Sequence, residues 1–255
     1  RIIIFKKKER KSSSSHPKLE YFYEYPAHDK DFDMHKSYEY SEEIKGLSIF
    51  PITDNNKLDL ISASYRNIHI DRIYQKSVKY FDQTNNGEIP KLKQSKNEVK
   101  NKTLLKLNGI HTSEINSVSI SNMNSENFIS SDEFKVYLWD INQAKEVYNM
   151  INTEANDTTD DCEKITTSCF SPYHSNIFAY GTSKGNLKYC DLRTSSKPSN
   201  FTTNFKDENS NLSKTIFANQ LLSVHDINFK QNNDYLMATR HYLNVNLWDQ
   251  RKSNE

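Results

Sequence analysis

Apolar and polar residues alternate in short runs along this chain of 255 residues, and polar turns separate the runs. The clearest set has runs at 115–120 and 128–131 and a third run that ends in Trp139-Asp140. Alternation with a period of two is typical of strands that bury one face. The set therefore predicts three short antiparallel strands, and the chain as a whole is predicted to be all-β.

The same pattern returns at 165–192 and at 224–249. The three copies close at Asp140, Asp191 and Asp249, so the intervals between them are 51 and 58 residues. A propeller blade takes about 40–45 residues, so each interval fits one blade and a loop insertion. Two Trp-Asp pairs at matching phase favour a WD40-type β-propeller over a β-sandwich in which such pairs arise by chance.

A weaker copy without Trp lies at 44–71, and residues 1–5 have the pattern of a strand that closes an earlier blade. The chain is therefore expected to be a single partial propeller domain over residues 1–255. The expected boundaries are 1–5 for the closing strand of blade 1, about 31–107 for blade 2, 108–155 for blade 3, 156–213 for blade 4 and 214–255 for blade 5.

Three segments fall outside the strand pattern, at 6–15, 74–107 and 195–213. The first is charged and Ser-rich, and a solvated loop is favoured over a nuclear-localisation patch. The second contains Asn86-Gly87, a strong signal for a hairpin turn, and is predicted as an exposed hairpin inserted into blade 2. The third is predicted as a polar loop.

The composition narrows the class of protein. The chain has 34 basic and 33 acidic side chains, so its net charge of +1 gives no overall attraction to nucleic acid. No apolar run approaches the roughly 18–20 residues that cross a bilayer, so no membrane span is expected. The cysteines (162, 169 and 190) are odd in number and lack CxxC spacing, which favours reduced thiols in an intracellular protein. We expect a cytoplasmic location, with the nucleus as a second.

No motif for catalysis or cofactor binding is present. The chain lacks the nucleophile-elbow, phosphate-loop, dinucleotide and zinc-protease patterns, and only five glycines occur in it. The eight histidines show no metal-ligand spacing. The sequence therefore predicts a protein-binding module that is not an enzyme and holds no metal or cofactor.

One histidine is better explained by structure than by chemistry. In a WD blade, a His before the first strand, a Ser or Thr in the second, the closing Trp and a turn acid can form a buried hydrogen-bond chain. His111, Ser130 or Ser131, Trp139 and Glu133 follow this order. We therefore assign His111 to the blade interior.

Acidic residues gather where turns are expected, at 38–43 and at Asp132-Glu133. Turns between blade strands lie at the faces of a propeller, so these acids would attract basic peptide segments. The alternative is that they are ordinary turn acids on a solvated surface.

Several of these segments resemble the B-type (55 kDa) regulatory subunits of protein phosphatase 2A. The similar segments are FDMHKSYEYSEEI at 32–44, HTSEINSVSI at 111–120, SSDEFKVYLW at 130–139, SKGNLKYCDLR at 183–193 and TRHYLNVNLWD at 239–249. They occur in the family's order across nearly the whole chain. Cys190-Asp191 in place of Trp-Asp is characteristic of the family.

The resemblance implies a seven-bladed propeller that is the non-catalytic member of a heterotrimer. It would dock on the helical-repeat (HEAT) scaffold subunit and place protein substrates beside a metal-dependent serine/threonine phosphatase, the catalytic subunit. A hairpin from the second blade contacts the scaffold in the family, and its counterpart here lies within 74–107. About two blades would be absent from this segment, so we expect two open edges and poor stability when it is expressed alone. The alternative is a generic WD-repeat interaction scaffold in another complex.

The resemblance also assigns residues to an acidic groove that recruits basic substrates. The matching positions are Lys36, Glu39, Glu42, Asp132 and Glu133. This chain departs from the family at Ser41, Glu43, Ser113, Glu114 and Asp161, which are expected to keep or raise the acidity of the groove and reduce its apolar contacts.

Overall fold

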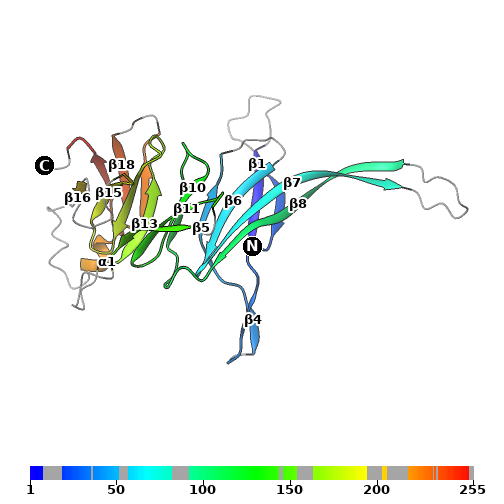
Figure 1. Ribbon diagram of the computed structural model, residues 1–255, viewed down its shortest axis with the longest axis horizontal. Coiled ribbons are helices and arrows are strands. Elements are labelled where there is room, and N and C mark those ends of the chain that lie inside the picture. The colour runs from blue at the N-terminus through cyan, green and yellow to red at the C-terminus, as the bar shows by residue number, and fades with distance from the viewer. Residues whose placement is uncertain are drawn as a thin grey trace, which may run out of the picture.

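The computed structural model describes residues 1–7, 19–35, 37–51, 57–81, 92–143, 146–153, 163–193, 203–205, 218–231, 233 and 235–252. These residues form nineteen strands and one short helix. The strands build antiparallel sheets that stand side by side as the blades of a partial WD40-type β-propeller (Figure 1). The prediction of an all-β propeller is therefore confirmed.

The sheets follow one another in chain order. Blade 1 contains β1 (Ile2–Lys7) and β2 (Leu19–Tyr25), and a small separate hairpin follows with β3 (Asp31–Asp33) and β4 (Tyr38–Tyr40). Blade 2 contains β5 (Ile44–Ile49), β6 (Lys57–Ser64), β7 (Asn67–Phe81) and β8 (Leu92–Asn108). Blade 3 contains β9 (Ser117–Ile120), β10 (Asn127–Ser131), β11 (Lys135–Asp140) and β12 (Val147–Asn152).

Blades 4 and 5 complete the described chain. Blade 4 contains β13 (Ile165–Phe170), β14 (Ile177–Thr182), β15 (Leu187–Asp191) and β16 (Thr203–Phe205). The helix α1 (Ala218–Leu222) leads into blade 5, which contains β17 (Asp226–Phe229), β18 (Leu236–Arg240) and β19 (Val245–Asp249).

Two details differ from the sequence prediction. The strand expected to close blade 1 is followed by β2, which pairs with it from Ile2↔Tyr25 to Lys7↔Leu19. The expected polar loop at 195–213 contains β16, which pairs with β15 and completes blade 4. Both strands lie at the outer edge of a sheet, where one face is solvated and the apolar alternation is weak.

The hydrophobic core lies between blades. Phe128 and Ile129 are consecutive in β10 and both fully buried, but they belong to different clusters. Phe128 packs with Ile61 and Ile70 of blade 2, because successive side chains of a strand point to opposite faces. Ile129 packs with residues of blade 4 such as Phe178. Equivalent clusters join blade 1 to blade 2 and blade 4 to blade 5, so each blade is stabilised mainly by its neighbours.

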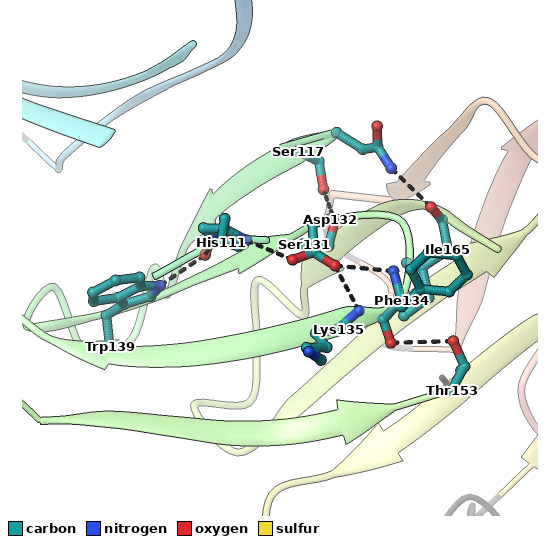
Figure 2. Close-up of polar contacts among 11 residues, drawn as sticks. His111, Ser117, Ser131, Asp132, Phe134, Lys135, Trp139, Thr153 and Ile165 are labelled. Atoms are coloured by element: carbon teal, nitrogen blue, oxygen red, sulfur yellow. Dashed lines mark hydrogen bonds and ion pairs between the residues drawn. The ribbon is translucent and has the colours of Figure 1, made fainter. Parts of the chain in front are cut away.

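A hydrogen-bond chain crosses the buried interior of blade 3 (Figure 2). The indole N–H of Trp139 donates to Ser130 Oγ over 2.7 Å, and Ser130 Oγ lies 2.8 Å from His111 Nε2. His111 Nδ1 lies 2.9 Å from Asp132 Oδ2, and both side chains are buried. Since an indole only donates and a carboxylate only accepts, the consistent assignment has Ser130 donating to Nε2 and His111 Nδ1–H donating to Asp132.

The acid in this chain is Asp132 and not Glu133, which corrects the expectation from the sequence. The second oxygen of Asp132 accepts the backbone N–H groups of Phe134 (2.9 Å) and Lys135 (2.7 Å). Burial alone would raise the pKa of Asp132, but the bonds from His111 and the two N–H groups hold this pKa below its ordinary value. Asp132 therefore fixes both the histidine and the turn that leads into β11.

Other blades satisfy the same positions differently. In blade 5, Trp248 donates to Thr239 over 2.8 Å, Thr239 contacts His241 Nε2 at 3.0 Å, and His241 Nδ1 reaches the carbonyl of Leu222 at 2.7 Å. In blade 4, the strand pairing places Tyr180 at the position of Ser130 and Cys190 at that of Trp139. The volume lost from Trp to Cys is thus regained from Ser to Tyr.

Replacing Ser130 with Ala is expected to lower the free energy of unfolding by about 2–4 kcal/mol, because the buried indole N–H and His111 Nε2 both lose their partner. Urea denaturation measures this loss. Ser131→Ala is the matched control: Ser131 is also fully buried, but its hydroxyl lies 2.8 Å from that of Ser117 and takes no part in the chain from Trp139 to Asp132. Equal losses for the two variants would contradict the role of the chain.

The Asp132 carboxylate is expected to make stability depend on pH. Its pKa is below the ordinary value of 3.8 in the folded protein, so its contribution is present above that value and is lost as the pH falls through the folded pKa. The difference in free energy of unfolding between wild type and Asp132→Asn should therefore shrink as the pH falls below about 4. Denaturation curves at several pH values test this, and a difference that stays constant would argue against an ionised Asp132.

Candidate protein-binding face

The chain brings several loops to one face of the propeller, which we call the acidic face. It is formed by the segments before β5, β9 and β13 and by the β6–β7, β10–β11 and β14–β15 turns. Because neighbouring strands are antiparallel, these segments lie at the same end of their sheets. The N–H of Ile115 donates to the carbonyl of Tyr65 (2.8 Å), and the N–H of Ile165 donates to that of Glu133 (2.7 Å). Each loop is thereby tied to the preceding blade.

A cleft of about 340 Å³ opens on the acidic face between blades 2 and 3. It is lined by Tyr40, Ser41, Glu42, Glu43, Lys45, Tyr65 and Glu114. Lys45 lies 2.9 Å from Glu43, and this hydrogen bond and the carboxylate charge raise the pKa of Lys45. With three carboxylates against one ammonium group, the lining keeps a negative charge beside two tyrosine rings.

The cleft also connects to the interior of blade 2. The hydroxyl of Ser64 donates to Glu42 over 2.7 Å and lies 3.1 Å from His28 Nδ1. The other nitrogen of His28 lies 3.1 Å from Ser62 Oγ, and its ring stacks on His69 at a centroid distance of 4.1 Å. Burial and the neighbouring His69 lower the pKa of His28 to about 4, so it is neutral near pH 7 and holds the serines as an uncharged partner.

The structure brings only some of the predicted groove residues together. Glu42 lines the cleft. Glu39 lies in β4, where its backbone pairs with that of Phe32, but the structure does not describe its side chain. Lys36 lies outside the described residues. Three of the positions noted as departures from the family, Ser41, Glu43 and Glu114, line the same cleft, whereas Asp161 lies outside the described part of the chain.

The predicted acidic pair Asp132-Glu133 is divided between the interior and the surface. Asp132 is fully buried in the chain with His111, so the expectation that it lines an exposed groove is corrected. Glu133 reaches the acidic face, where Lys164 lies 3.1 Å from its carboxylate. The turn thus contributes one surface carboxylate, and a cation from blade 4 already contacts it.

Four side chains of this face were not singled out from the sequence: Tyr40, Tyr65, Lys45 and Lys164. Tyr40 lies within the segment 32–44 that resembles the family, and Tyr65 lies in the turn between β6 and β7. Neither position by itself indicates that a tyrosine lines a binding cleft. The lysines follow glutamates by one or two residues, which is common on any solvated loop. The contact of Lys164 with Glu133 depends on how blades 3 and 4 stack, and sequence spacing does not encode that.

The described residues contain no group of three or more His, Cys, Asp or Glu side chains that could hold a metal ion. Burial raises the pKa of Cys169 to about 11 and also raises that of Cys190, so both thiols stay protonated near neutral pH. Cys162 lies outside the described residues. Within the described chain, no helix has the length and apolar character to cross a membrane.

A two-stranded ribbon extends from blade 2 (Figure 1). β6 pairs with β7 only as far as Tyr74, and beyond it β7 pairs with β8 alone, from Gln75↔Val99 to Phe81↔Leu92. This is the hairpin that the insertion at 74–107 predicted, although Asn86-Gly87 lies outside the described residues. Its exposed side chains include the lysines at positions 76, 79 and 96, and Lys100 is exposed at its base, opposite Tyr74.

Comparison with known proteins gives relatives for the whole chain. It is 27% identical over 98% of its length to the B-type regulatory subunit of protein phosphatase PP2A from Schizosaccharomyces pombe. It is equally similar to the gamma isoform of the human 55 kDa B-type regulatory subunit of serine/threonine-protein phosphatase 2A, and 26% identical over its full length to the corresponding PP2A protein of Candida tropicalis. The chain spans 56%, 59% and 52% of these relatives.

No protein-family model matches the chain. Among solved structures, the computationally designed Ika8 protein has a TM-score of 0.43 and 15% identity over 81% of this chain and 45% of that one, too distant to support an argument. The curated relatives are regulatory subunits by name, which agrees with the expectation that this chain is not an enzyme. Over 98% of its length the chain is thus similar to proteins named as B-type regulatory subunits of protein phosphatase 2A, in agreement with the five similar segments.

Proposed function

We propose that this chain is the non-catalytic, substrate-targeting part of a phosphatase 2A heterotrimer. The observation that carries the proposal is the cleft in which Glu42, Glu43 and Glu114 meet between Tyr40 and Tyr65, on a chain whose relatives are regulatory subunits along its whole length. We place this role in the cytoplasm, with the nucleus as a second location.

The mechanism is positioning. The negative cleft attracts basic segments of protein substrates, and the tyrosine rings accept the aliphatic part or the charged end of a Lys or Arg side chain. A substrate held there has a raised effective concentration at an active site on another protein of the trimer. The chain itself supplies no nucleophile and no acid or base to the reaction.

The ribbon of β7 and β8 is the proposed contact with the scaffold subunit. A two-stranded ribbon that no third strand covers is marginally stable in water and gains stability when a partner packs against it. Among the described residues of the ribbon and its base, Lys76, Lys79, Lys96 and Lys100 outnumber the one acid, Glu98, which lies 3.5 Å from Lys100. The ribbon is therefore suited to an acidic partner surface.

Recovery of partners separates this proposal from a generic WD-repeat scaffold. Affinity purification of the tagged protein from cells should recover a phosphatase scaffold subunit together with a catalytic subunit. Recovery of an unrelated assembly without them would favour the generic scaffold.

Charge reversal in the cleft should weaken substrate binding. The triple variant Glu42→Lys, Glu43→Lys, Glu114→Lys is expected to bind a lysine-rich peptide about tenfold more weakly or worse at low ionic strength, and the difference should shrink as salt screens the charges. Fluorescence anisotropy measures the affinity. Glu126→Lys is the control, because Glu126 is exposed in the β9–β10 turn at the opposite end of its blade. Unchanged binding by the triple variant would refute the cleft as the substrate site.

Charge reversal in the ribbon should affect assembly but leave peptide binding unchanged. Lys76→Glu, Lys79→Glu and Lys96→Glu together are expected to abolish or strongly reduce co-purification of the scaffold subunit, because like charges then oppose the acidic partner. The control is Lys230→Glu, an exposed lysine that follows β17 in blade 5. Normal scaffold recovery with the triple ribbon variant would place the contact elsewhere.

A further inference from the structure

Lys164 holds a position on the acidic face that a basic residue of a visiting protein would take. Its ammonium group lies 3.1 Å from Glu133 Oε2 and 5.8 Å from the centroid of the Phe134 ring. A carboxylate beside an aromatic face is a favourable setting for a cation. Glu133 and Phe134 thus form a cation site in blade 3, and its occupant comes from blade 4 of the same chain.

The backbone presents Lys164 to this site. The carbonyl of Lys164 accepts the N–H of Ser183 (2.8 Å), and its own N–H donates to Ser183 Oγ (3.1 Å). The next residue, Ile165, donates its N–H to the carbonyl of Glu133. These bonds hold the lysine backbone over the turn that carries the acid, so only the freedom of the side chain is lost when its ammonium group reaches Glu133.

The other carboxylate nearby does not draw Lys164 away. Glu163 accepts hydrogen bonds from Thr182 and Asn186, both at 2.6 Å, and lies 3.0 Å from Lys188. Its charge is therefore already balanced inside blade 4. This leaves Glu133 as the acid that Lys164 contacts.

The contact can nevertheless be displaced. The side chains of Lys164 and Glu133 are 50% and 37% exposed, and ion pairs exposed to this extent contribute little to stability. A cation from outside can exchange with Lys164 at small cost, provided that the rest of the visitor is already bound.

The cleft, which lies on the neighbouring loop, can bind another part of the same visiting segment first. Glu114 lines the cleft, and two residues later Asn116 donates its backbone N–H to the carbonyl of Ser131 and its side-chain amide to the carbonyl of Ile165 (both 2.8 Å). One short segment thus joins the cleft to the surroundings of Glu133 and Lys164. A peptide attached at the cleft would bring a second basic residue to Glu133 at high effective concentration.

We propose that Lys164 is an intramolecular competitor at the Glu133–Phe134 cation site, so that a basic residue of a visiting segment binds there only by displacing Lys164. This inference rests on the proposed function, because it concerns the same face and the same class of substrate. Lys164 acts here through Glu133: it lowers the affinity of every segment that places a basic residue at Glu133, without closing the site.

The test compares two synthetic peptides with a Gly/Ser background, one with a single lysine and one with a lysine cluster, binding to the protein at low salt. Lys164→Gln should tighten binding of the single-lysine peptide about two- to fivefold, as the release of one exposed ion pair permits. The gain should be at least as large for the lysine cluster, because every segment that displaces Lys164 from Glu133 pays the same cost for doing so. In a Glu133→Gln background the substitution should have no effect.

Lys184→Gln is the matched control, since it removes one positive charge from the neighbouring β14–β15 turn and leaves the contact between Lys164 and Glu133 in place. Equal tightening by Lys164→Gln and Lys184→Gln, or a Lys164 effect that persists without Glu133, would overturn the inference. These outcomes differ from failure of the proposed function, in which charge reversal at Glu42, Glu43 and Glu114 would leave both peptides unaffected.

Discussion

The burial of each blade against its neighbours is the constraint on which the rest of the structure depends. A blade is a small sheet with apolar side chains on both faces, as Phe128 and Ile129 show in β10, and water cannot be excluded from both by one sheet alone. The N–H groups of Ile115, Ile165 and Val224 donate to carbonyls of the preceding blade and fix how far adjacent blades rotate and slide. Loop positions on the acidic face follow from that packing.

This packing places polar groups where water cannot reach them, and the blades solve the problem separately. Blade 3 joins Trp139 to Asp132 through Ser130 and His111, whereas blade 5 ends the corresponding chain on a backbone carbonyl through His241. Blade 2 takes its histidine from position 28, before the β3–β4 hairpin, and connects it through Ser64 to Glu42. The buried polar groups of these chains therefore have hydrogen-bond partners, but the residues that provide these partners differ from blade to blade.

Much of the fold could be predicted from the sequence, because alternation and phased Trp-Asp pairs depend on local spacing. The edge strands β2 and β16 could not, since β2 lacks a clean alternation of apolar and polar residues and β16 is only three residues long. The site was harder to predict. Asp132 and Glu133 are adjacent and chemically alike, and only the turn geometry decides that one faces His111 and the other faces solvent. Glu42 and Glu114 line one cleft only because blades 2 and 3 are in contact, and the sequence does not show that contact.

The same hydrogen bond that joins blades 3 and 4 also determines the electrostatics of the surface. Ile165 cannot reach the carbonyl of Glu133 without bringing residue 164 over the Glu133 side chain, so the identity of residue 164 sets the charge that a visitor meets there. A lysine at this position lowers the local negative potential, whereas a neutral residue would leave the carboxylate available. A propeller can thus change its partner preference at residues before inner strands while keeping the packing between blades, because those side chains lie outside the core that holds the blades together.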